Sequence, residues 1–509
     1  MNHKQNPEIP TLFVMSPLAA RTSDSIALLW DKPAGRDVER YEVVVDGAPA
    51  ACTKATDFTL KNLVAGREHE IQVRAMVKDG GSLQSNILRC ATRPGSQVFD
   101  VVAYGAAGDG MTLNTKAIQA AIDACTPGGT VRIPTGVFLS GAIFLKSDMT
   151  LYLNEGAVLL GSPETRDYPL MEYRWEGRER TCYASLVNSR NMPGERLRDI
   201  TIAGHGKIDA NGSALRKREL AEAAGSPGRA VCIRNTDGVY LYGITVRQSP
   251  VWCVHIIYCS DVCANGVQIN TRCDDNGNWY EDIVNGDGLN PDSCKGVHIF
   301  NCDIASQDDC IAIKSGRDAE GRAVGLPTEN VRISNCRFTH GFGVAVGSEM
   351  SGGVRNVLVE DCVFHDTFSI ASVKAPRGRG SVLENITYRD CTLVNKDPHN
   401  QDCQWFRGAL YVDTFYGHKE FDPHKAEPKD EGTPVIQNVL FENITLDTIG
   451  GNAIYLTGLP ESPLKDIRLI NVRAVGKYGF VANNIRGLVL DHIAVDAREG
   501  TAMQFVNVM

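Results

Sequence analysis

An irregular internal repeat in the second half of the chain limits its fold more than any other feature. Each copy places Asn, Asp or His before an apolar residue, and apolar positions alternate after it. Cys302 is followed by Cys336 after 34 residues, by Cys362 after 26 more and by Cys391 after 29 more. The copies are HIFNCDI (298–304), ISNCRF (333–338), VEDCVF (359–364), YRDCTL (388–393), FENITL (441–446), LINVRAV (469–475) and LDHIAV (490–495).

Strand-rich repeats of this size, without amphipathic helices, are typical of a parallel β-helix. One coil cannot bury its inner face alone, so neighbouring coils must stack. The unequal spacing predicts loops of different lengths, which leave the coils and build a groove. A β-propeller is the alternative, but the sequence lacks an even pattern of four strands per blade. We therefore predict an all-β chain, whose main part is a right-handed parallel β-helix.

The length of 509 residues predicts two domains, one of them large. Residues 1–96 read as a small β-sandwich, because DSIALLW (24–30), ERYEVVVDG (39–47) and REHEIQVRAM (67–76) alternate apolar and polar positions. Trp30, Tyr41 and LKNLVAGREHEIQVRA resemble a fibronectin type III module, although His69 stands where that module has Tyr. We expect no chemistry in this domain.

The second domain is predicted to span residues 97–509. It opens with a strand, a Gly-Asp-Gly turn and an amphipathic helix in residues 99–125, where Asn114 or Thr115 can cap the helix. Ile118, Ala121 and Ile122 then form its apolar face. Short strands follow in residues 128–162. This opening resembles the N-terminal cap of pectin-degrading β-helix proteins.

Composition narrows the possible partners. The formal net charge of -9 argues against a nucleic-acid binder, although a few basic residues in one groove can still bind carboxylates. The 16 cysteines include no CxxC pair with zinc spacing, and those in the repeats read as small buried residues, so no structural metal is expected. Neither a signal peptide nor a membrane span is apparent, and with many thiols this favours the cytoplasm.

Two neighbouring coils supply acidic residues at matching places. Asp287 in NGDGLNPDSC lies 21 residues, about one coil, before Asp308 in SQDDCIAIKSG, and Asp309 follows directly. Side chains on adjacent coils stack about 5 Å apart. Adjacent residues of an extended chain point to opposite faces, so Asp308 and Asp309 can share a groove only if the backbone bends. Crowded carboxylates keep one group protonated near neutral pH, as a general acid requires.

Asn285-Gly286-Asp287 followed by Asp308-Asp309 resembles glycoside hydrolase family 28, the polygalacturonases and their relatives, and the resemblance covers about residues 99–500. It implies hydrolysis of a glycosidic bond with inversion, which requires a general acid and a base that activates water. Carried over, Asp308 is the general acid, Asp287 and Asp309 activate water, and Asn285 contacts the substrate. The resemblance implies no metal and no cofactor.

Two later family motifs are altered. His340 lies near the place of the family Gly-His-Gly, but counting back from Gly347 puts the family His nearer Gly341 or Phe342. We weigh a catalytic His340 equally with a solvated loop histidine.

The family Arg-x-Lys motif, which grips the substrate carboxylate, reads Ser372-Val373-Lys374. Lys374 is retained as a substrate-binding residue. Arg377 or Arg379 can compensate for the missing Arg, and Lys314 is another candidate anchor. The change at Ser372 also leaves open a different sugar beside the cleaved bond.

Two further features are assigned to the groove. Trp252 and His255 in SPVWCVHI lie about one coil before Asp287, and we favour sugar contacts over a place in the core. The polar stretch 395–432, with Trp405 and Tyr411, is interpreted as a wall of the groove rather than a disordered insertion.

The sequence therefore predicts an inverting glycosidase acting on pectic chains that contain α-linked galacturonic acid. Exo attack is preferred, because the extra N-terminal domain and the long loop can each close one end of the groove. A different pectic linkage such as rhamnogalacturonan, calcium-dependent lyase chemistry and a non-catalytic carbohydrate-binding β-helix are the alternatives. The oligomeric state stays open.

Overall fold

The computed structural model describes residues 12–33, 35–78, 80–190, 194–401, 407–417 and 421–509. The chain divides into a small unit, Met1–Gln97, and a large unit, Val98–Met509. The division after Gln97 lies one residue beyond the boundary predicted from the sequence.

The small unit holds two antiparallel sheets. One contains β1 (Val14–Met15), β2 (Ile26–Trp30) and β5 (Asp57–Leu60). The other contains β3 (Val38–Val45), β4 (Ala48–Thr53), β6 (Glu68–Val77), β7 (Ser82–Gln84) and β8 (Leu88–Ala91). Trp30 is fully buried and meets the ring of Tyr41 edge-on at 5.4 Å. His69 is buried as well, and its Nδ1 lies 2.9 Å from Asp46 Oδ2, so the imidazole keeps a polar partner there.

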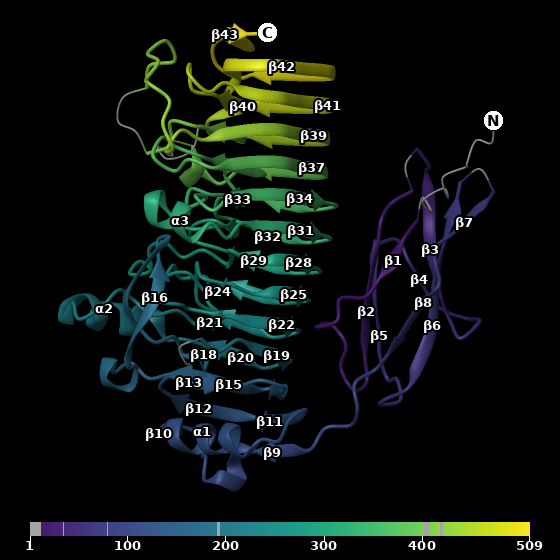
Figure 1. Cartoon of the computed structure of the whole chain (residues 1–509), viewed down its shortest axis with the longest axis vertical. Coiled ribbons are helices and arrows are strands. Elements are labelled where there is room, and N and C mark those ends of the chain that lie inside the picture. The colour runs from purple at the N-terminus through teal and green to yellow at the C-terminus, as the bar shows by residue number, and fades with distance from the viewer. Residues whose placement is uncertain (1–11, 34, 79, 191–193, 402–406, 418–420) are drawn as a thin grey trace. The chain divides into compact units, whose positions relative to one another are not determined.

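The large unit is a parallel β-helix with three rows of parallel strands (Figure 1). In its last coils a single long strand runs through two of the rows. The first row contains β9 (Val98–Asp100), β11 (Gly129–Ile133), β14 (Met149–Leu153), β19 (Leu197–Gly204), β22 (Thr236–Tyr242), β25 (Ser260–Asn265), β28 (Lys295–Phe300), β31 (Thr328–Ser334), β34 (Val354–Glu360), β37 (Val382–Asn395), β39 (Val435–Thr448), β41 (Leu464–Gly476) and β42 (Tyr478–Ala497). The second contains β10 (Asp109–Leu113), β12 (Gly136–Ser140), β15 (Ala157–Gly161), β20 (Lys207–Asp209), β23 (Thr245–Arg247), β26 (Gln268–Asn270), β29 (Asp303–Ala305), β32 (Arg337–Thr339) and β35 (Val363–His365). The third contains β13 (Ile143–Leu145), β18 (Val187–Ser189), β21 (Val231–Arg234), β24 (Val254–Ile257), β27 (Leu289–Asp292), β30 (Ile311–Ile313), β33 (Val344–Val346), β36 (Ala371–Lys374), β38 (Gly408–Asp413), β40 (Asn452–Thr457), the beginning of β42, and β43 (Met503–Val508).

The polar residue of each repeat marks the corner between the first and second rows. Asn301, Asn335, Asp361 and Asp390 all have φ between 52° and 55°, the left-handed region that Asn and Asp tolerate best among residues with a side chain. The Cys that follows each of them is at most 2% exposed and points into the core. Its thiol donates to the carbonyl two residues earlier, as Cys302 does to Phe300 at 3.3 Å. The predicted buried role of these cysteines is therefore confirmed.

Stacked asparagines stabilise the start of the first row. The side-chain amide of Asn356 donates to Asn330 at 2.9 Å, that of Asn385 to Asn356 at 3.0 Å, and that of Asn438 to Asn385 at 2.7 Å. Each amide can donate to the coil before it and accept from the coil after it, so the ladder links the coils. The apolar inner faces of the rows form one continuous core along the helix.

The N-terminal coil is capped by η1 (Val101–Tyr104) and α1 (Thr115–Ala124), which lie at the lower end of Figure 1. Ile118, Ala121 and Ile122 are buried, as predicted. Asn114 precedes α1, but its side chain bonds the backbone of Ala107 and Thr112 instead of capping the helix. The other helices are η2 (Thr165–Asp167), α2 (Gly212–Glu222), α3 (Asp318–Val324) and η3 (Pro398–Asn400).

Two segments that leave the coils are important for the site. The hairpin of β16 (Leu170–Trp175) and β17 (Arg178–Tyr183) lies against the coils (Figure 1). The stretch 395–432 was predicted to be a loop, but it contains strand β38 of the third row. Tyr411 on β38 is buried and stacks on Tyr455, so it belongs to the packing rather than to a wall of the groove. Trp405 lies outside the described residues.

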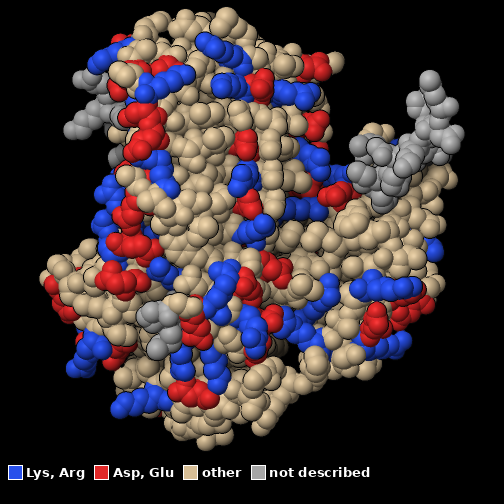
Figure 2. Space-filling model, in the orientation of Figure 1, with Lys and Arg blue, Asp and Glu red and all other residues tan. Residues whose placement is uncertain are grey.

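Basic and acidic side chains are interspersed over the visible face (Figure 2). Among the described residues, none of the helices has the length and apolar character needed to cross a membrane.

Candidate active site

The three predicted aspartates lie where chain segments enter the third row. Asp287 is two residues before β27, and Asp309 is two residues before β30; these neighbouring strands pair Leu289 with Ile311. The same register places Asp287 beside Asp309, and the Gly288 N–H donates to the Asp309 carbonyl at 2.9 Å. The backbone bends at Gln307 and Asp308, which lets Asp308 and Asp309 face the same site.

The carboxylates converge as the sequence predicts. One oxygen from each of Asp287, Asp308 and Asp309 lies within 4.8 Å of the other two. Burial, and then the charge of Asp309, raise the pKa of Asp308 to about 6, which keeps this group protonated in mildly acidic solution. Burial also raises the pKa of Asp287, and the Lys314 ammonium opposes the shift.

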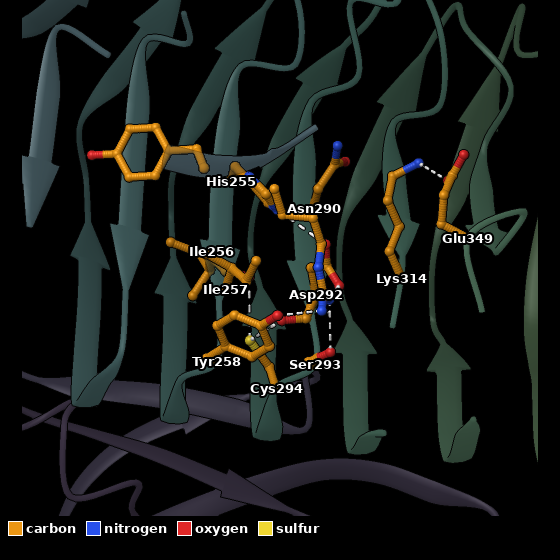
Figure 3. Close-up of polar contacts among 12 residues, drawn as sticks. His255, Ile256, Ile257, Tyr258, Asn290, Asp292, Ser293, Cys294, Lys314 and Glu349 are labelled. Atoms are coloured by element: carbon orange, nitrogen blue, oxygen red, sulfur yellow. Dashed lines mark hydrogen bonds and ion pairs between the residues drawn. The ribbon is translucent and has the colours of Figure 1, made fainter. Parts of the chain in front are cut away.

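Two buried lysines balance this negative charge. Lys374 on β36 donates to Asp309 Oδ2 at 2.7 Å, while Asp309 Oδ1 is buried and has no hydrogen-bond partner in the described part of the chain. Lys314 donates to Glu349 Oε2 at 2.9 Å and lies 3.5 Å from Asp287 Oδ2 (the Lys314–Glu349 bond is drawn in Figure 3). Burial would raise the pKa of Glu349, but the Lys314 ammonium lowers it to about 2, so this residue stays ionised.

The carboxylates open into a cavity of about 420 Å³. Its acidic lining residues are Glu176, Asp287, Asp308, Asp309 and Glu349. Its basic lining residues are Lys314, Arg317, Lys374, Arg377 and Arg379. Such a mixture suits a substrate that carries carboxylates and hydroxyls and reacts at buried acids. The aspartate oxygens are also close enough to share a cation, but the Lys374 and Lys314 ammonium groups already lie beside them.

Three other predicted residues line the cavity. Asn285 does so in a left-handed backbone conformation, with φ of 52°. Trp252 is only 3% exposed, because Trp175 stacks on it at 5.3 Å and Lys314 Nζ lies 4.6 Å from its ring centroid. It therefore forms a wall of the cavity rather than an open stacking platform. Arg377 donates to both oxygens of Glu461, at 2.6 and 3.0 Å, so its guanidinium is already paired.

The predicted contact between His255 and the substrate is wrong. The side chain is fully buried, its Nε2 lies 3.3 Å from Asp292 Oδ2, and burial lowers its pKa to about 4 (Figure 3). Arg174 from the hairpin donates to the other oxygen of Asp292 at 2.7 Å. His255 also meets Trp252 edge-on at 5.2 Å, so it supports the cavity wall from behind.

His340 is not among the residues that line the cavity. Its Nδ1 lies 3.6 Å from Asp397 Oδ2. The Phe342 N–H, two residues later, donates to the Asp308 carbonyl at 3.1 Å. The structure therefore gives no support to a direct catalytic role for His340. Ser372 is likewise fully buried, with its hydroxyl 2.8 Å from that of Ser369, so it does not face the substrate.

Sequence reasoning did not name several lining residues, although the stretch 395–432 that it assigned to a wall of the groove supplies Tyr416 and Gly417. Glu176 is at the tip of the β16–β17 hairpin, Arg317 follows IAIKSG, Glu349 follows Gly347-Ser348, and Tyr416 lies in the loop after β38. Of these residues, only Arg317 and Glu349 could have been found from the sequence. Each directly follows a motif on a strand that carries one of the aspartates or lies next to such a strand. The hairpin and the loop reach the cavity through tertiary packing, which spacing along the chain does not encode.

Comparisons with known proteins show which families the two units of the chain resemble. Residues 131–488 match the model of glycosyl hydrolases family 28, and residues 16–90 match the fibronectin type III domain. A "Probable polygalacturonase" of Vitis vinifera is 31% identical over 405 residues, 77% of this chain and 76% of the relative. An "Exo-poly-alpha-D-galacturonosidase" of Dickeya chrysanthemi is 31% identical over 65% of this chain and 61% of its own length.

Among solved structures, a family 28 exopolygalacturonase of Yersinia enterocolitica aligns with a TM-score of 0.83 over 97% of this chain and 98% of its own. At 23% identity this likeness supports the fold alone. The family match covers most of the chain, and it contains the three aspartates and both buried lysines of the cavity. The chain is therefore a glycoside hydrolase that belongs to glycosyl hydrolases family 28.

Proposed function

We propose that this protein is an exo-acting hydrolase of pectic chains that contain α-linked galacturonic acid, and that it inverts the anomeric carbon. The observation that carries the proposal is the group of three carboxylates within 4.8 Å of one another, in a cavity with five basic residues. A polyanionic uronate chain needs such basic residues, because each sugar carries a carboxylate that must be bound away from the acidic centre.

In this mechanism Asp308 protonates the leaving glycosidic oxygen. Burial and the charge of Asp309 raise its pKa to about 6, and no lysine of the described residues forms an ion pair with it, whereas Lys314 lies 3.5 Å from Asp287 Oδ2 and favours the ionised form there. Asp309 and Asp287 orient the attacking water. Asp309 Oδ1 has no other partner among the described residues and is available to accept from that water, while Lys374 holds Oδ2 at 2.7 Å. Asn290 donates to Asp287 Oδ2 at 2.9 Å and fixes the second acceptor.

The segments that surround the cavity support the exo mode. The hairpin tip at Glu176 and the loop at Tyr416 and Gly417 both line it, so segments outside the coils contribute to its walls. The name of the Dickeya relative supports the same mode. Rhamnogalacturonan remains the alternative substrate, because Ser372 occupies the place of the family Arg and is buried. The cytoplasmic location stays a prediction.

Early products decide between these possibilities. We expect polygalacturonate digests, sampled at low conversion, to contain monogalacturonate without a ladder of oligomers. Proton NMR of the first released sugar should show the β anomer. The usual carboxyl separation is about 5 Å for retaining enzymes and about 6.5–9.5 Å for inverting ones. The three carboxylates here lie within 4.8 Å of one another, so the anomer measurement is a stringent test of inversion. A ladder would rule out exo attack, an α anomer would rule out inversion, and an unsaturated product would indicate a lyase.

Activity should fall as the pH rises through about 6. The general acid must carry its proton, and burial together with Asp309 raises the pKa of Asp308 to about 6, so its active form is present below that value and lost above it. We expect kcat/KM on trigalacturonate to decrease about tenfold per pH unit on the alkaline side. A profile that stays flat to about pH 8 would exclude Asp308 as the titrating acid.

A further inference from the structure

The five basic residues of the cavity differ in how firmly they are already held. Lys374 has a partner oxygen at 2.7 Å and Lys314 one at 2.9 Å. Arg377 binds both oxygens of Glu461, and Arg379 donates to the Ser348 carbonyl at 2.8 Å and to Asp318. Each of these side chains already makes a contact within the usual distance range of a charge-assisted hydrogen bond.

Arg317 is the exception among them. Its guanidinium lies 3.5 Å from Glu176 Oε2 and 3.5 Å from Asp318 Oδ2, both beyond hydrogen-bond range. Its Nε is buried and has no hydrogen-bond partner within the described residues. Asp318 already has closer partners, because its Oδ2 accepts from Arg178 at 2.7 Å and its Oδ1 accepts from Arg379. A guanidinium with five donors is therefore left under-bonded on the cavity wall.

The backbone of Arg317 is nevertheless fixed. Its N–H donates to the carbonyl of Gly177, at the tip of the β16–β17 hairpin, at 3.0 Å. Gly177 has φ of 79°, and a Cβ at this position would lie 2.5 Å from Arg317 Cβ. The hairpin tip thus packs directly on Arg317, and only glycine permits this approach. A side chain whose backbone is fixed and whose N–H donors are unsatisfied is suited to bind a ligand carboxylate through two hydrogen bonds.

We propose that Arg317 binds a uronate carboxylate of the substrate, and that Glu176 occupies its guanidinium until that carboxylate displaces it. This inference rests on the proposed function and assigns the carboxylate recognition that Ser372 does not provide. The Glu176 side chain is 41% exposed, so solvent screens its pair with Arg317 and displacement costs little. An incoming carboxylate would supply a bidentate bond at shorter range.

The test compares Arg317→Gln with wild type on trigalacturonate and on its methyl ester. We expect KM for trigalacturonate to rise about 10- to 100-fold with kcat changed much less, because the lost bond forms before the chemical step. The preference for the free acid over the ester should shrink by a similar factor. The KM of Arg317→Lys should lie between those of wild type and Arg317→Gln, because an ammonium keeps the positive charge but not the paired donors of the guanidinium. Arg337→Gln is the matched control: it removes an exposed arginine, 64% accessible, outside the cavity.

A second variant tests whether Glu176 competes with the substrate carboxylate for Arg317. Glu176→Gln should lower KM in the wild-type background and leave it unchanged in the Arg317→Gln background. An Arg317→Gln protein with the KM and ester preference of wild type would overturn the inference even if hydrolysis proceeds as proposed. If wild type hydrolyses no galacturonate substrate, the proposed function fails, and calorimetric titration with trigalacturonate then decides the inference by itself. Weaker binding to Arg317→Gln than to wild type would support it, whereas equal or absent binding would reject it.

Discussion

Replacing Asp308 with asparagine is expected to lower kcat on a galacturonate oligomer by about 10² to 10⁴-fold while leaving the folded structure intact. A general acid contributes a rate factor of this size. The asparagine has the same shape, and it offers an amide that is unable to transfer the proton. Asp308 lies outside the hydrophobic core, and its Oδ1 accepts only the N–H of Asp309, at 2.9 Å, among the bonds of the described chain. The melting temperature should therefore stay close to that of wild type.

Asp303→Asn is the matched control for this prediction. Asp303 is on β29, a few residues earlier in the same coil, its side chain is 40% exposed, and it pairs with Arg337 on the next coil. This variant should keep the wild-type rate. Single-turnover measurements would show that the loss in Asp308→Asn is in the chemical step. If Asp308→Asn kept the wild-type rate, the acid would have to be sought at Asp287, whose pKa is also raised by burial.

The coil could be predicted from the sequence because its corners require a special backbone conformation. Asn335 and Asp361 adopt positive φ, and few residues other than Gly, Asn and Asp do so readily. The corner residue therefore recurs in every copy, although the loops between copies differ in length. The aspartates could be predicted for a related reason, since residues just before paired strands of adjacent coils must lie side by side.

The residues around the aspartates were harder to predict, because their burial depends on segments that leave the coils. His255 and Trp252 are on the coils, yet the hairpin lays Trp175 over Trp252 at 5.3 Å and directs Arg174 at Asp292 beside His255. A segment with no repeat pattern thus limits Trp252 to a wall of the cavity, while His255 lies buried behind that wall. His340 was assigned by its distance from a motif, and a shift of two residues puts Phe342 beside Asp308 instead.

Removing the positive charge from Arg174 should have the largest effect on stability of any change outside the core. Its side chain is 1% exposed and that of Asp292 is fully buried, and Arg174 Nη1 donates to Asp292 Oδ1 at 2.7 Å and to Ser293 Oγ at 3.0 Å. Its Nη2 also donates to the Tyr258 hydroxyl. Arg174→Met would leave a buried carboxylate without its main partner. We expect the free energy of unfolding in urea to fall by about 3–5 kcal/mol.

Two matched variants separate the uncompensated charge from the loss of packing. Arg174→Met combined with Asp292→Asn removes both charges, so most of the lost stability should return. Arg132→Met breaks an exposed pair with Asp100, in which the arginine is 45% accessible, and should cost less than about 1 kcal/mol. The deficit of Arg174→Met should also shrink as the pH falls, because a proton taken up by Asp292, or by His255 at 3.3 Å, replaces the missing charge. A deficit that is independent of pH and persists in the double variant would instead attribute the loss to the contacts of Arg174 with Tyr258.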